Sequence, residues 1–102
     1  MFIYTVSATF TDAAVADEWV AWLRDGHLAD VMRGGALDAE VVRVDGAELV
    51  YEARYHFASR EAFTRYERDF APALRAEGVA KFPTSRGVDY RRSTGDVVLP
   101  RG

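Results

Sequence analysis

One histidine and a group of large aromatic residues are the side chains in this chain that could act on a small molecule. His27 follows Gly26 where the apolar stripe of a predicted helix changes phase, so its imidazole can turn into the space between helix and sheet. Imidazole titrates near neutral pH and can serve there as a general base or a hydrogen-bond partner. The aromatic residues that would line a pocket beside it are Trp19, Trp22, Tyr51 and Tyr55. We predict His27 as the catalytic residue and these aromatics as the ligand-binding residues.

Each of these predictions has a purely structural alternative. A histidine at a helix break can cap the helix or support the fold through a hydrogen bond, and aromatics at helical and strand spacing usually pack a core. A metal site would draw on Asp25, His27 and Asp30, with His56, but this spacing matches no established ligand motif. We therefore predict no metal ligands. His56 falls on the polar face of a strand, where we expect a ladder of surface salt bridges.

Composition narrows the chemistry further. The chain of 102 residues has no cysteine, which excludes disulfides, thiolate nucleophiles and cysteine-bound metals. It also has no Asn or Gln, so an oxyanion must be recognised by backbone N–H groups or by other side chains. The net charge is −3, and no stretch approaches the roughly 18 apolar residues of a membrane span. We expect a cytoplasmic protein with no nucleic-acid or membrane partner and no bound cofactor.

Familiar catalytic and binding motifs do not occur. No serine lies in a GxSxG elbow, and Gly34 with Gly35 is typical of a helix end rather than of a phosphate loop. An RNA-recognition module would carry aromatics on the open face of its sheet among basic residues, whereas Tyr4 and Tyr51 fall on the apolar face that must cover the helices. An acylphosphatase-like site would need an Asn beside its Arg.

The hydrophobic pattern predicts the strands that must position these side chains. Strict alternation over 2–10 and 49–57 predicts two strands, each with one apolar face. A valine-rich run over 37–45 precedes the Asp45-Gly46 turn signal and predicts a hairpin with the second of them. A further short strand is predicted over 88–93.

Two helices are predicted between the strands. The first begins after Asp12, breaks near Gly26 because its apolar stripe changes phase there, and stops at the glycine pair 34–35. The second begins after Ser59, has Pro72 inside its stripe and ends by residue 78, so we predict a kinked helix or a very tight break.

This order of elements predicts a ferredoxin-like βαββαβ sandwich, an α+β fold with two helices on one face of an antiparallel sheet. We expect a single domain over residues 1–102, with residues 94–102 as a tail or an extra edge strand at 96–99. The other face of the sheet is mostly polar with a few aliphatics. We predict that this face pairs two copies into a dimeric α+β barrel, with the tail adding to the partner's edge.

Three segments carry a resemblance over most of the chain. They are FIYTVSATF, then EWVAWLRDGHLADVMRGG with its Trp, His and Gly-terminated turn, and RYERDFAPALRAEGVAKFP after the hairpin. In these the chain resembles a small bacterial family of unknown function with a ferredoxin-like, dimeric α+β barrel fold. It departs from the family near Glu77, where an extra histidine often occurs, and after Ser93. The resemblance implies a fold and a homodimer, with no assigned reaction. The wider dimeric α+β barrel group includes small monooxygenases, isomerases and dehydratases with pockets between sheet and helices, an analogy of fold alone.

Two functions from different classes remain open. The first is a pocket between sheet and helices that binds or transforms a small apolar or aromatic molecule. The second is a non-catalytic homodimer that acts as a structural or interaction protein and takes no ligand. Replacing His27 with alanine separates them: loss of ligand response, with stability kept within about 1 kcal/mol, favours the pocket, whereas an effect on stability alone favours the second function.

Overall fold

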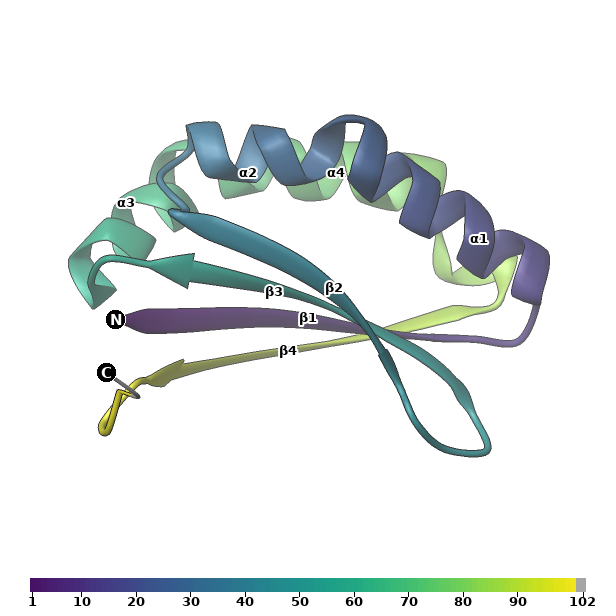
Figure 1. Ribbon diagram of the computed structural model, residues 1–102. Helices are drawn as coiled ribbons and strands as arrows, with labels where there is room; N and C mark the ends of the chain where they lie inside the picture. The colour runs from purple at the N-terminus through teal and green to yellow at the C-terminus, as the bar shows by residue number, and fades with distance from the viewer. Residues whose placement is uncertain (101–102) are drawn as a thin grey trace.

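Strands and helices alternate along the chain in the computed structural model, which describes residues 1–100 (Figure 1). In chain order the elements are β1 (Phe2–Phe10), α1 (Ala13–Trp22), the π-helical turn η1 (Leu23–His27), α2 (Leu28–Arg33), β2 (Asp38–Val44), β3 (Leu49–Phe57), α3 (Arg60–Asp69), α4 (Ala71–Lys81), the 3-10 turn η2 (Thr84–Arg86) and β4 (Val88–Asp96). The four strands form one antiparallel sheet in the order β2-β3-β1-β4, and the helices cover one of its faces. The predicted ferredoxin-like α+β fold is confirmed.

Strand β1 lies at the centre of the sheet and pairs along its whole length with both neighbours. Phe2 lies opposite Phe57 of β3 and opposite Asp96 of β4. Because β1 offers nine residues for pairing, β4 continues to Asp96, and the prediction of a strand ending at residue 93 was too short. No separate strand forms over residues 97–100, where the Val97 N–H donates to the Met1 carbonyl (2.9 Å). The rest of the predicted tail, residues 101–102, lies outside the described residues.

Alternation along β1 and β3 places the core between the sheet and the helices, as the pattern predicted. Large buried side chains from the two strands are Phe2, Tyr4 and Phe10 of β1 and Tyr55 and Phe57 of β3. From the helices, Trp19, Val31 and Tyr66 are buried against this face. The core is therefore unusually aromatic, and neighbouring rings touch: Phe57 and Phe63 lie 5.3 Å apart between ring centroids.

The phase break predicted near Gly26 is a kink, at which the Leu28 N–H donates to the Leu23 carbonyl five residues back. Gly26 leaves helical geometry (φ 179°, ψ −36°), and α1 and α2 continue on either side of it. The wider turn takes up one extra residue, so the apolar stripe before it and the stripe after it can face the same side. Leu23 and Val31 are accordingly both buried, at 1% and 0% exposure.

The second predicted helix is two helices, α3 and α4, with a break at Phe70. Pro72 lies in the first turn of α4, where its missing N–H removes no helical hydrogen bond. The helix runs on to Lys81, so the expected end at Gly78 was wrong. Close packing explains why residue 78 is a glycine inside the helix, because a Cβ at this position would lie 3.3 Å from Cη2 of Trp22. Gly78 thus marks a close approach between helices.

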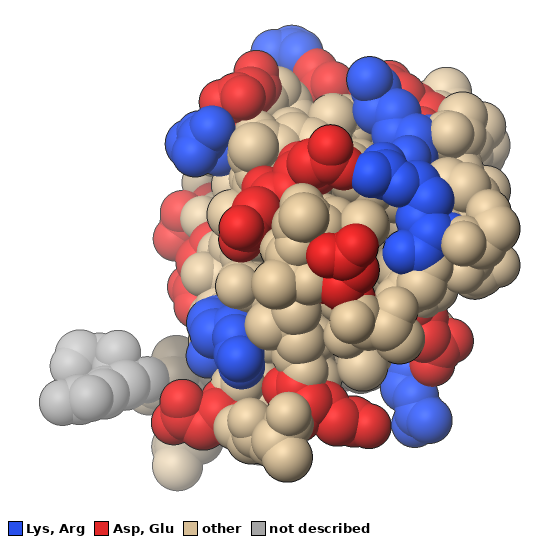
Figure 2. All heavy atoms as spheres, turned by 90° about the vertical axis from the view of Figure 1, so that its right-hand side faces the viewer, with Lys and Arg blue, Asp and Glu red and all other residues tan. Residues whose placement is uncertain are grey.

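The open face of the sheet carries a ladder of charged side chains on β2 and β3. Arg54 donates to Glu52 (2.8 Å) and lies 3.9 Å from Glu40, and His56 Nε2 lies 3.8 Å from the same Glu40 carboxylate. Beside the ladder, half-buried aliphatic residues interrupt the polar surface: Ile3, Val42 and Val50. Figure 2 shows the end of the molecule at the right of Figure 1, where acidic and basic side chains both occur. None of the helices within residues 1–100 is long and apolar enough to cross a membrane.

Candidate ligand pocket

A cavity of about 60 Å³ lies between the helix layer and the sheet. Its walls come from β1, β3 and β4 on one side and from α1, η1, α3 and α4 on the other. The exposed residues among its lining are Val79 of α4 and Arg92 of β4, so the mouth lies between α4 and the β4 edge of the sheet. At roughly 10–15 Å³ per water-sized probe, the cavity has room for about four to six waters.

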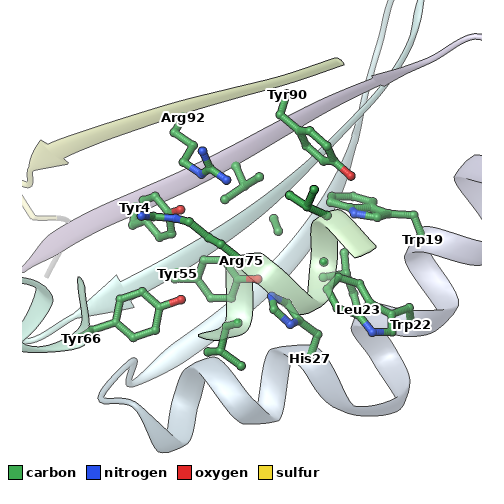
Figure 3. A pocket seen from close by; sticks show the side chains of 15 residues that line it. Tyr4, Trp19, Trp22, Leu23, His27, Tyr55, Tyr66, Arg75, Tyr90 and Arg92 are labelled. Atoms are coloured by element: carbon green, nitrogen blue, oxygen red, sulfur yellow. The ribbon is translucent and has the colours of Figure 1, made fainter. Parts of the chain in front are cut away.

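The two ends of the cavity differ in chemistry (Figure 3). Trp19, Trp22 and Leu23 lie together at one end, and this end is largely apolar. Polar groups gather at the other end, and they come from five different elements: Tyr4, Tyr55, Tyr66, Arg75 and Arg92. His27 lies between the two ends. A molecule in this cavity would thus meet rings on one side and hydrogen-bond donors on the other.

His27 is held in the wall of the cavity by its stack on Trp22. The two rings lie 4.1 Å apart between centroids with an angle of 22° between their planes. Its Nδ1 is buried and has no hydrogen-bond partner among residues 1–100. Burial lowers the pKa of His27 below its ordinary value, and nearby Glu77 opposes this only in part. The imidazole is therefore neutral at pH 7 and keeps one buried nitrogen without a protein partner.

Arg75 is charged although it lines the cavity. Burial lowers its pKa, but Tyr4 and Glu67 outweigh that effect, so the pKa of Arg75 is raised overall. Its Nη2 donates to both carboxylate oxygens of Glu67 at 2.6 Å. Its Nε is buried and has no partner in the described chain. The guanidinium therefore keeps one buried donor unused beside its ion pair with Glu67.

Two tyrosines beside Arg75 stay neutral far above neutral pH. Burial raises the pKa of Tyr55 and also that of Tyr66, because the phenolate would lose its hydration. Neither hydroxyl makes a hydrogen bond to another of residues 1–100, although both residues are at most 3% exposed. Each is therefore an available O–H donor at the polar end of the cavity.

A family model described as "Domain of unknown function (DUF4286)" matches residues 1–91. The chain belongs to this family. No curated protein matches the DUF4286 chain. The family assignment agrees with the predicted family of unknown function and assigns no reaction.

Solved structures similar to the DUF4286 chain share its fold at low sequence identity. A dimeric ferredoxin-like protein from an uncultured marine organism has a TM-score of 0.76 at 16% identity, over 98% of this chain and 97% of that chain. SnoaB, a cofactor-independent oxygenase from Streptomyces nogalater, has a TM-score of 0.67 at 15% identity, over 97% and 95%. The heme-degrader MhuD from Mycobacterium tuberculosis has a TM-score of 0.66 at 22% identity, over 98% and 99%. At these identities the likeness establishes the fold alone.

Most residues predicted for the pocket of the DUF4286 chain line the cavity, and one does not. His27, Trp19, Trp22 and Tyr55 are in its wall. Tyr51 lies outside it, edge-on to Phe10 at 6.2 Å between centroids and beneath Arg43. It shares a face of β3 with Tyr55, but four strand residues place it roughly 13 Å further along. Tyr51 therefore does not line this cavity, and its role as a ligand-binding residue stays a prediction.

The structure separates His56 from the other residues of the metal alternative. His27 lies on the helix side of the sheet, whereas His56 lies on the open face, so the two histidines of the DUF4286 chain cannot share an ion. Within residues 1–100, no group of three His, Asp or Glu side chains is arranged to hold a metal.

The sequence pattern does not predict the polar end of the pocket. Tyr4 was predicted on the apolar face of a strand, and Tyr66 was not predicted as a pocket residue. Arg75 was overlooked, although it precedes Gly78, Val79 and Phe82 at helical spacing on an inward stripe of α4. A charged residue on an otherwise inward stripe is the signal that would have found it.

Proposed function

We propose that this protein binds a small apolar or aromatic molecule in the cavity between sheet and helices, and that it works as a homodimer. The observation that carries the proposal is the cavity itself, which has an apolar end built from two tryptophans and an opposite end with unused hydrogen-bond donors. Pockets of this composition, mostly apolar with a few polar groups, are typical of ligand sites. No prosthetic group is part of the proposal.

The size of the cavity limits the ligand. A space of about 60 Å³ takes only a small molecule as it stands. Trp22 is half-buried and also lines a second hollow with Asp25, Glu77 and Lys81, so it forms a wall between the two spaces. A rotation of Trp22 would join them and admit a larger ring system.

His27 is the proposed catalytic residue if the ligand is transformed. A neutral imidazole with an unpaired Nδ1 can accept a proton from a ligand hydroxyl or from an activated C–H group. The similar structures include a heme-degrader and a cofactor-independent oxygenase, which act on small molecules with this fold. They support the class of function through the fold only.

The open face of the sheet is the proposed dimer interface. Two similar structures are described as dimeric ferredoxin-like proteins. On this chain the face combines half-buried Ile3, Val42 and Val50 with a charged ladder. Aliphatic residues surrounded by paired charges are typical of surfaces that meet a second copy. Size-exclusion chromatography with light scattering tests this: Val42→Arg should convert a dimer into a monomer, whereas Met32→Arg, at an exposed site on α2 in the helix layer, should not.

Intrinsic fluorescence tests ligand binding directly, because the chain has two tryptophans and both line the cavity. Native mass spectrometry of the purified protein would first identify any retained small molecule. Titration with apolar and aromatic compounds should then change the tryptophan emission. Gly78→Leu places a side chain into the cavity beside Trp22 and should abolish the response, whereas Ala80→Leu, on the exposed side of the same helix, should leave it intact.

The alternative function, a homodimer without a ligand, is favoured by one observation. Trp22 and His27 stack on each other and so already fill part of the space. A bare dimer in native mass spectrometry, with no change of tryptophan emission for any compound, would establish this alternative and refute the ligand pocket.

A further inference from the structure

The charge of the cavity lining is one-sided. Two arginines, Arg75 and Arg92, and one histidine line the cavity, and no acidic residue among the described residues does so. Glu67 lies outside the lining and is already paired with Arg75. Arg92 makes no ion pair with any of residues 1–100. Because His27 is neutral and Glu67 offsets Arg75, the uncompensated positive charge at this end of the cavity comes from Arg92.

The donors at this end outnumber the acceptors. The Nε–H of Arg75 is buried and unpaired, and the hydroxyls of Tyr55 and Tyr66 have no partner in the described chain. The buried, unpaired Nε–H of Arg75 carries a cost that a ligand with acceptor oxygens would relieve, and the two tyrosine hydroxyls can donate to the same ligand. An ionised oxygen relieves it best, because hydrogen bonds to a charged acceptor are about twice as strong as neutral ones.

The distance between the polar and the apolar end sets the shape of the ligand. Figure 3 shows Tyr4, Arg75 and Arg92 gathered at one side of the cavity and the two tryptophans at the other. A ligand that satisfies both ends has a flat apolar part and an anionic oxygen group at one edge.

We infer that the cavity selects an aromatic monoanion, whose ring lies toward Trp19 and Trp22 and whose carboxylate or ionised phenol oxygen is held by Arg75 and Arg92. This inference rests on the proposed function, because it assigns the chemical class of the ligand to the same cavity. It also assigns a binding role to both arginines. The tyrosine hydroxyls complete the recognition as neutral donors.

Benzoate and benzamide are a matched pair of probes, because they have nearly the same shape and differ in charge. Binding is measured at pH 7.5 through the tryptophan emission. Benzoate should bind about ten-fold more tightly than benzamide, which is what a charge-assisted contact of about 1.4 kcal/mol provides. In Arg75→Met and in Arg92→Met this ratio should fall toward one. Arg65→Met, which removes an exposed charge from α3 outside the cavity, should keep the ratio.

The two arginine variants protect the test against misfolding. Arg75→Met leaves Glu67 without its partner and could weaken the fold, whereas Arg92→Met breaks no ion pair within residues 1–100. A ten-fold preference that is lost in Arg92→Met supports the inference. Equal binding of the two probes, or a preference kept in both variants, overturns the inference and leaves the proposed function standing. If neither probe binds, the inference is refuted. The proposed function fails as well only if no neutral compound changes the tryptophan emission.

Discussion

Replacing Gly87 with alanine should destabilise the fold by about 2–5 kcal/mol, for two separable reasons. Gly87 has a φ of +82°, in the left-handed region that costs an L-residue roughly 1–2 kcal/mol. A Cβ there would also overlap Oγ1 of Thr11, and such crowding costs about 1–3 kcal/mol. The Thr11 N–H donates to the Gly87 carbonyl (2.9 Å), so the two backbones are held together and cannot easily separate. Gly87 leads directly into β4, the strand that supplies Tyr90 and Arg92 to the cavity.

A double-mutant cycle followed by urea denaturation separates these two costs. Thr11 is exposed, so Thr11→Ala alone should change the free energy of unfolding by no more than about 0.5 kcal/mol. Relative to Gly87→Ala, the double variant should regain the stability lost to crowding, about 1–3 kcal/mol. It should still lack the stability lost to the left-handed backbone conformation at residue 87. A double variant as unstable as Gly87→Ala would show that Thr11 is not the obstacle. A Gly87→Ala protein within about 0.5 kcal/mol of the parent would refute the whole argument.

Three further predictions concern local packing, capping and pH. Gly34→Ala should lower the free energy of unfolding by about 1–3 kcal/mol, because its Cβ would lie 2.8 Å from the ring of buried Tyr66. Gly95→Ala is the control, since a Cβ there meets nothing within 4 Å. Equal thermal unfolding midpoints for the two variants would contradict this prediction. Asp12→Ala should cost about 1 kcal/mol in urea unfolding through loss of the cap of α1, and Asp12→Ser should retain most of the stability. Burial lowers the pKa of His27, so the folded state binds this proton less readily than the unfolded state, and stability should be lost as pH falls below about 6.5. His27→Phe, which keeps the stack on tryptophan, should flatten the dependence of the urea midpoint between pH 7 and 5, and an unchanged dependence would show that another group causes it.

Hydrophobic periodicity predicted the sheet and helix layers because the buried face of each strand or helix depends on residues that are close together in the sequence. Alternation over 2–10 and 49–57 is sufficient to assign the buried and open faces of β1 and β3, and both assignments are confirmed. The break at Gly26 was also predictable, since two apolar stripes out of phase can share a core only if the helix between them is irregular.

What could not be predicted depends on distances between elements. Periodicity says that Tyr51 and Tyr55 share a face, but not that only Tyr55 lies under the gap between α1 and α4. The end of α4 was predicted wrongly at Gly78 for a similar reason. In the sequence, a glycine that is required by close contact with Trp22 cannot be distinguished from a glycine that ends a helix. The cationic end of the cavity combines Arg75 with Arg92, which meet only once the sheet is assembled.

The kink at Gly26 makes one wall of the cavity depend on the number of residues between α1 and α2 more than on their types. Each residue of an α-helix advances by about 100°, so deleting a single residue between Leu23 and His27 would rotate α2 by that angle relative to Trp19. Val31 would leave the core, and the imidazole would lose its place on Trp22. Substitutions can therefore change the shape of this pocket gradually, whereas a single insertion or deletion between Leu23 and His27 would remove the pocket. Relatives that keep the pocket should align without a gap from residue 19 to residue 31.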